Sequence, residues 1–161
     1  MIKKLLLALL LGYASLLQAE SGLWTTTIKQ PMEQVYPVVY KALEDNRFFV
    51  VLEPDMGSRM ANFAERWGED YNRNQLDGIR SMVFCNIWWT NRMANTHPHM
   101  LGLCPLSISL YEKGGETTLV LPRPSALAAG SAGGDEAMSA AKELEQELTD
   151  ILSKAAEAAG Q

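Results

Sequence analysis

The fold class is decided by one stretch of the sequence, LSISLYEKGGETTLVL at residues 106–121. At 106–110, leucine and isoleucine alternate with serine, which is typical of a β-strand with one buried face. Gly114 and Gly115 provide the positive φ angles of a tight turn, and 117–121 forms the returning strand. This hairpin predicts a sheet that is at least partly antiparallel.

Upstream of the hairpin, the sequence predicts three further strands that alternate with three helices. Apolar periodicity and turn residues place the strands at 23–28, 48–52 and 79–85 and the helices at 31–43, 55–67 and 87–95. The order β-α-β-α-β-α-β-β predicts an α+β, two-layer domain over residues 20–127. Asp55 is expected to cap the second helix. The apolar face of that helix, with Met56, Met60 and Trp67, is expected in the core.

The C-terminal part of the chain is predicted to add an acidic amphipathic helix. Residues 128–134 contain only alanine, glycine and serine and indicate a flexible linker. From 135 to 161, seven acidic residues stand against two basic ones, a net charge of −5. Leu144, Leu148 and Leu152 repeat at helical spacing. A helix with a single apolar stripe must dock on the body of the domain or on a partner.

The N-terminus has the pattern of a secretory signal peptide. Lys3 and Lys4 precede an apolar run at 5–17, and Ala19 precedes the expected cleavage site. The run is shorter than the roughly 20 residues of a membrane-spanning helix. We therefore expect residues 1–19 to be removed and the product to be periplasmic or secreted, without stable membrane insertion. An uncleaved N-terminal anchor is the alternative.

Composition and charge exclude several classes of protein. The chain has 161 residues, of which 47% are hydrophobic and 20% are charged, as in an ordinary globular domain. Fourteen basic and nineteen acidic residues give a net charge of −5, which argues against binding to nucleic acid. Two cysteines are too few for a disulfide-dense small protein or for an all-cysteine zinc site.

Residues 81–124 resemble a known family. The shared features are a strand ending in Phe84-Cys85-Asn86, a short helix with Met93, then His97-Pro98, Leu103-Cys104-Pro105 and the hairpin. On these residues the chain is similar to the bacterial family catalogued as domain of unknown function 302, and the resemblance covers residues 21–127. It implies a compact α+β domain, often a homodimer, with no agreed activity, to which this chain adds its C-terminal helix. The family usually has proline before the second cysteine, whereas here Cys104 precedes Pro105.

The loop between Cys85 and Cys104 carries the candidate chemistry. In an oxidising compartment, two cysteines at the ends of neighbouring strands most simply form a structural disulfide. Alternatively they are reactive thiols, because Cys85 precedes the helix at 87–95 and a helix N-terminus lowers the pKa of a nearby thiol. Trp88 and Trp89 begin that helix and are expected either to line a pocket or interface, or to pack at least one ring in the core.

A metal or haem site is a second interpretation of the same loop. Met93 and His97 are four residues apart, and His99 and Met100 follow them. Copper prefers histidine, methionine and cysteine ligands, and haem iron also takes histidine and methionine. Covalently attached c-type haem is excluded, because the sequence has no C-x-x-C-H motif. The plainer alternative is that both histidines are exposed loop residues.

The sequence thus predicts an exported domain without an assigned reaction. Its most direct interpretation is a non-enzymatic accessory protein that binds a small ligand or a periplasmic partner and is stabilised by a disulfide. The alternative is a periplasmic redox, metal or haem protein that uses the loop from Cys85 to Cys104. A hydrolase or transferase has no motif in its support.

Overall fold

A computed structural model of the protein describes residues 22–161. The signal peptide predicted at 1–19 lies outside the described residues. No helix within 22–161 has the length and apolar composition needed to cross a membrane. The elements follow in the order β1 (Leu23–Ile28), α2 (Met32–Asp45), β2 (Phe49–Leu52), α3 (Met56–Ala61), α4 (Ala64–Trp67), η1 (Gly68–Asp70), β3 (Gly78–Cys85), α5 (Ile87–Thr96), η2 (Pro98–Leu103), β4 (Leu106–Lys113), β5 (Glu116–Pro122), α6 (Pro124–Ala128) and α7 (Gly134–Ala159).

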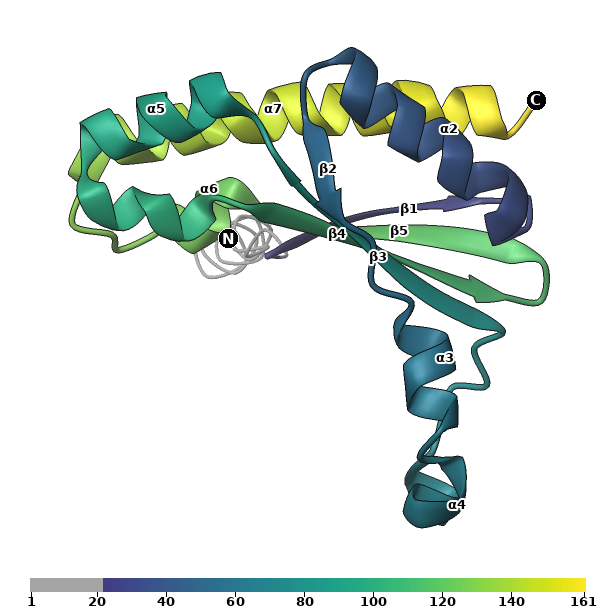
Figure 1. The fold of residues 1–161 in the computed structure, drawn as a ribbon. Coiled ribbons are helices and arrows are strands. Elements are labelled where there is room, and N and C mark those ends of the chain that lie inside the picture. The colour runs from purple at the N-terminus through teal and green to yellow at the C-terminus, as the bar shows by residue number, and fades with distance from the viewer. Residues whose placement is uncertain (1–21) are drawn as a thin grey trace, which may run out of the picture.

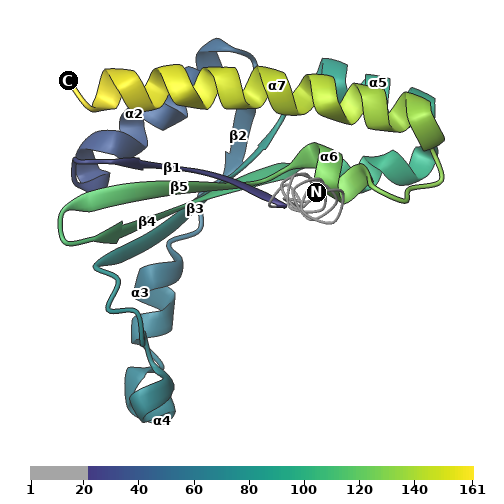
Figure 2. The ribbon, with the colours of Figure 1, turned by 180° about the vertical axis from the view of Figure 1, so that it is seen from behind.

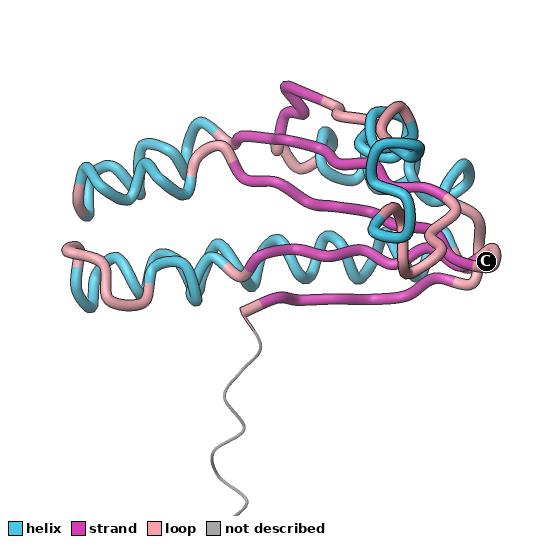
Figure 3. The backbone as a smooth tube through the Cα atoms, turned by 90° about the horizontal axis from the view of Figure 1, so that it is seen from below, coloured by secondary structure: helices cyan, strands magenta, loops and turns pink. Residues whose placement is uncertain are grey.

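The strands form one sheet in the order β1-β5-β4-β3-β2, and every neighbouring pair is antiparallel (Figure 3). The β4–β5 hairpin lies at its centre, with Leu110 opposite Leu119. The predicted α+β class is confirmed, and the antiparallel pairing extends to the whole sheet. The connections from β2 to β3, from β3 to β4 and from β4 to β5 each return to a neighbouring strand, whereas α2 carries the chain from β1 at one edge to β2 at the other, so that β1 pairs with β5.

Two long helices, α2 and α7, cover one face of the sheet (Figure 1). The last helix passes beside α2 and extends as far as α5 at its other end (Figure 2). The core lies between the sheet and these helices, where burial of apolar surface supplies the main stabilising free energy. Its fully buried side chains include Val39, Leu43, Phe84, Ile108, Leu110, Leu119 and Leu121.

The C-terminal helix α7 docks on the body of the domain. Leu144, Leu148 and Leu152 are completely buried, which confirms the apolar stripe and shows that the body provides its partner surface. The short α6 was not predicted, although Pro124 stands at a helical start position that proline favours. An added Cβ at Gly133, just before α7, would lie 3.3 Å from the Cβ of His97. The predicted linker therefore packs closely on the turn between α5 and η2.

A polar cluster ties α2 to the sheet on the covered face. The Tyr36 hydroxyl donates a 2.8 Å hydrogen bond to Glu53, and the Arg80 guanidinium lies 3.6 Å from the centre of the tyrosine ring. Burial, together with the hydrogen bond to Glu53, raises the pKa of Tyr36. Tyr36 therefore stays protonated and serves as a packing and hydrogen-bonding residue between the two layers.

The segment between β2 and β3 forms an arm that projects from the body (Figures 1 and 2). Asp55 caps α3 as predicted, accepting a 2.9 Å hydrogen bond from the Ser58 N–H. The expectation that this segment contributes to the core was wrong: Met56 and Trp67 are 42% and 41% exposed, and Met60 is only half-buried. The single helix predicted at 55–67 is instead divided into α3 and α4 by Asn62 and Phe63. The arm leads away from the sheet, so no second layer packs against its apolar residues (Figure 1).

Candidate functional site

Both cysteines lie at one end of the sheet, where the connection from β3 to β4 begins and ends. Cys85 is the last residue of β3, and Cys104 follows η2 directly before β4. Because β3 and β4 are antiparallel neighbours, the chain that leaves through α5 returns through η2 to the same place. Both cysteines are half-buried free thiols. The predicted disulfide is therefore not formed in this structure.

Thr90 joins the two thiols. Its Oγ1 lies 3.1 Å from the Sγ of Cys85 and donates a 2.9 Å hydrogen bond to the carbonyl oxygen of Asn86. The thiol of Cys104 interacts with the side chains of both Thr90 and Cys85. Burial is the main reason that the pKa of Cys104 is raised. The two thiols thus share one hydroxyl without a covalent bond, and their pairing on oxidation stays a prediction.

The proposed metal ligands lie at the other end of α5. His97 caps its C-terminus, its Nδ1 accepts a 3.2 Å hydrogen bond from the His99 N–H, and the two rings are 4.6 Å apart. Met93 and Met100 are buried in the hydrophobic core. A ten-residue helix is about 15 Å long, so the histidines and the thiols do not share a first coordination shell. Within residues 22–161, no cluster of three histidine, cysteine or acidic side chains is arranged around a metal position.

The two tryptophans of α5 have different environments. Trp89 is 4% exposed, and its indole N–H donates a 2.8 Å hydrogen bond to Glu147 on α7. Trp88 is 59% exposed and contacts Trp89 edge to face, with 4.7 Å between ring centres. Trp89 therefore fastens α5 to α7, whereas Trp88 is available at the surface.

A shallow groove of about 570 Å³ runs between α2 and the C-terminal half of α7. Its walls are largely apolar, with lysines on both sides. Lys41 pairs with Asp45 at 2.6 Å. Lys154 makes no ion pair within the part of the chain that the structure describes. The lining residues are Pro37, Val38, Lys41, Ala42, Asp45, Asn46, Ile151, Lys154, Ala155 and Ala158.

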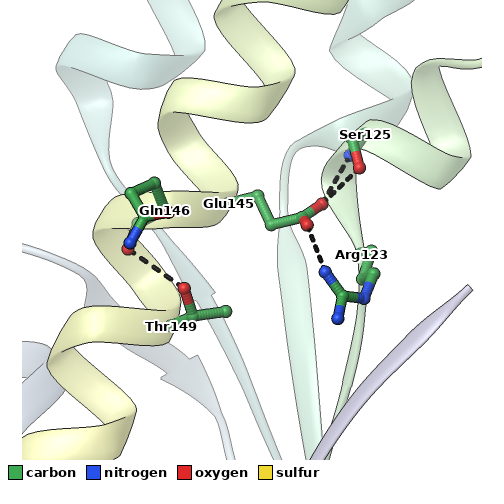
Figure 4. Close-up of polar contacts among 5 residues, drawn as sticks. All are labelled: Arg123, Ser125, Glu145, Gln146 and Thr149. Carbon is green, nitrogen blue, oxygen red and sulfur yellow. Dashed lines mark hydrogen bonds and ion pairs between the residues drawn. The ribbon is translucent and has the colours of Figure 1, made fainter. Parts of the chain in front are cut away.

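A buried carboxylate on α7 was missed by the sequence reasoning. Glu145 accepts 2.7 Å and 3.1 Å hydrogen bonds from Arg123 and the Ser125 N–H, and a further one from the Ser125 hydroxyl (Figure 4). Burial disfavours its charged form, but these donors outweigh burial and lower the pKa of Glu145. Gln146 directly follows Glu145, and Thr149, about one turn further along α7, donates a 3.1 Å hydrogen bond to the Gln146 carbonyl oxygen (Figure 4). The only sequence signal is position: Glu145 directly follows Leu144 on the buried stripe.

Comparison with known proteins identifies relatives but no activity. The family model described as domain of unknown function DUF302 matches residues 24–155, which include most of α7. A crystal structure of an uncharacterized conserved DUF302 protein from Bacillus stearothermophilus is similar, with a TM-score of 0.71. It is 16% identical in sequence, and the match covers 84% of this chain and 98% of that one. At this identity the similarity shows the fold alone. No curated protein matches the chain.

Proposed function

Because this chain belongs to the DUF302 family, a domain of unknown function, we propose a role from its own surfaces. The protein is an exported, non-enzymatic accessory protein that binds a small ligand in the groove between α2 and α7. The ligand is a single-chain amphiphile with an anionic head group. The observation that carries this proposal is an apolar groove of about 570 Å³ with an unpaired lysine on its α7 wall.

The dimensions and chemistry of the groove support this ligand class. Small-molecule sites commonly have volumes of about 300–1,000 Å³ and are mainly apolar with a few polar groups. Alanine and proline side chains leave room for an alkyl chain along the two helices. The charge of Lys41 is balanced by Asp45, so Lys154 is the cation available to a carboxylate or sulfate head group.

The direct test uses dodecanoate as the probe and the mature exported protein. We expect dodecanoate to raise the melting temperature and to bind measurably by calorimetry, because a ligand of the folded state stabilises it by mass action. Changing Lys154 to glutamate is expected to weaken binding by about tenfold, equivalent to one lost charge-assisted contact of about 1.4 kcal/mol.

Lys142→Glu is the matched control, since Lys142 is exposed on the same helix but outside the groove. Ala158→Trp, at an exposed position on the groove wall, is expected to block binding by filling the space. If dodecanoate does not shift the melting temperature, or if Lys142→Glu and Lys154→Glu weaken binding equally, the groove is not the ligand site.

We also propose that the arm pairs with the arm of a second copy, giving a homodimer. Phe63 and Trp67 are stacked in the exposed arm, with 5.1 Å between ring centres and 16° between ring planes. A two-fold interface places the same surface on both subunits, so it must complement itself. The arm meets this condition because exposed residues of both charges flank its apolar stack, among them Arg59, Arg66, Glu65 and Glu69.

Light scattering coupled to size-exclusion chromatography tests the dimer. We expect the unmodified protein to have twice the chain mass, and the double variant Phe63→Ser with Trp67→Ser to have the single-chain mass. Loss of two central aromatic anchors costs about 2 kcal/mol or more each in interfaces of this kind. Leu127→Ser, at another 57% exposed apolar position, is the control and is expected to leave the dimer intact. A single-chain mass for the unmodified protein would contradict the proposal.

A further inference from the structure

Four exposed apolar residues belong to the strand, helix and turn that carry or adjoin the two cysteines. Phe49 lies opposite Cys85 in the β2–β3 ladder and is 45% exposed. Ile87 and Trp88, in the first turn of α5, are 73% and 59% exposed. Leu101 is 44% exposed, and its carbonyl accepts a 3.0 Å hydrogen bond from the Cys104 N–H. We refer to Phe49, Ile87, Trp88 and Leu101 as the apolar rim.

A purely structural role of the two cysteines does not explain the apolar rim. A cystine that only stabilises the fold requires no exposed apolar neighbours, and single exposed apolar residues are common on protein surfaces. Four such residues in the segments that adjoin one pair of thiols offer apolar area that a segment of another protein can cover. Here the two thiols are close to each other and to Thr90, as a pair that exchanges with a disulfide must be.

We propose that Cys85 and Cys104 form a thiol–disulfide exchange site for proteins whose cystine lies within an apolar segment. The segment binds on the apolar rim and presents its disulfide to Cys85. This activity is independent of the groove between α2 and α7, because the groove includes no residue of the dithiol or of the rim.

The exchange balances in atoms and electrons. The Cys85 thiolate attacks one sulfur of the partner's cystine, forming a mixed disulfide and releasing the other partner sulfur as a thiolate, which takes up a proton. The Cys104 thiol then loses its proton and attacks Cys85 Sγ, so that the mixed disulfide breaks and the second partner sulfur leaves. The Cys85–Cys104 pair is oxidised by two electrons, and the partner's cystine is reduced to two thiols.

The surroundings assign different roles to the two cysteines. Burial raises the pKa of Cys104, which disfavours it as the first nucleophile but does not prevent attack on an adjacent sulfur. Cys85 directly precedes Asn86, the N-cap of α5, and lies opposite the exposed Phe49, so it is the cysteine beside the apolar rim.

The test uses the full exported protein in its reduced form and a synthetic peptide with one intramolecular cystine flanked by leucine and phenylalanine. After incubation, alkylation and intact-mass measurement, we expect the protein to be lighter by two hydrogen atoms and resistant to alkylation, and the peptide to carry two alkylated thiols. If both protein cysteines are still alkylated in the presence of excess peptide, the proposal is wrong. This measurement needs no variant and therefore no assumption about the folding of variants.

Two sets of variants then test the assigned roles. Cys104→Ser is expected to accumulate the mixed disulfide with the peptide, and Cys85→Ser is expected to form none; the reverse pattern would overturn the assignment. Ile87→Ser with Trp88→Ser is expected to slow exchange with the apolar peptide by about tenfold, while a serine- and glycine-flanked peptide reacts at an unchanged rate. Leu127→Ser is the matched surface control. If the unmodified protein exchanges with both peptides at the same rate, the apolar rim does not take part in binding the partner.

Discussion

Truncation of Leu148 to alanine is expected to lower the free energy of unfolding by about 2–5 kcal/mol. The side chain is completely buried at the middle of α7, where that helix packs on the body of the domain. The variant loses the transfer free energy of the removed carbons and leaves a cavity that the long helix cannot close by moving locally. Urea unfolding followed by circular dichroism measures the loss as a lower midpoint with an unchanged slope.

Leu127→Ala is the control for this experiment, because the same chemical change is made at a site that is 57% exposed. It is expected to change stability by no more than about 0.5 kcal/mol. A loss below about 1 kcal/mol for Leu148→Ala would mean that α7 is an appendage that can detach. A large loss, with a single transition, would make α7 part of the same cooperative unit as the sheet.

The sequence predicted those parts of the fold whose signal is local. The hairpin follows from strict alternation and two glycines, and the cap of α3 follows from one aspartate before a helical segment. The arm was misassigned because apolar spacing describes which face a residue occupies, not whether another layer faces it. Met56 and Trp67 have the same pattern as a core helix, and only the three-dimensional path of the chain leaves them exposed.

The residues of the candidate site could be predicted from the sequence, but their arrangement in space could be predicted only in part. The proximity of Cys85 and Cys104 follows from their positions at the two ends of one strand connection. The different environments of the tryptophans could have been read from register, because Trp89 and Met93 are four residues apart and share the buried face of α5. The partners of Glu145 are twenty or more residues away in sequence, and no local pattern indicates such contacts.

Replacing Glu145 by glutamine is expected to cost about 2–3 kcal/mol of stability near neutral pH. The carboxylate accepts hydrogen bonds from Arg123 and Ser125, and the nearly isosteric amide leaves the guanidinium without its counter-charge. Arg123 is poorly placed to recover the loss, since its Nε is already buried without a hydrogen-bond partner. The lowered pKa of Glu145 also makes its contribution depend on pH in a defined direction.

Since the fold lowers this pKa below the ordinary glutamate value of 4.5, the stabilisation is complete above that value. It is lost as the pH falls through the lower pKa of the folded state, where the folded carboxylate is also protonated. The difference in stability between the two proteins, followed from pH 7 downwards, is therefore expected to begin to shrink near pH 4.5 and to vanish only below the pKa of the folded state. Glu157→Gln, at an exposed position near the end of the same helix, is expected to show a small difference at every pH. A gap between Glu145→Gln and the unmodified protein that stays constant down to acid pH would mean that side-chain shape, rather than charge, holds α7 to Arg123.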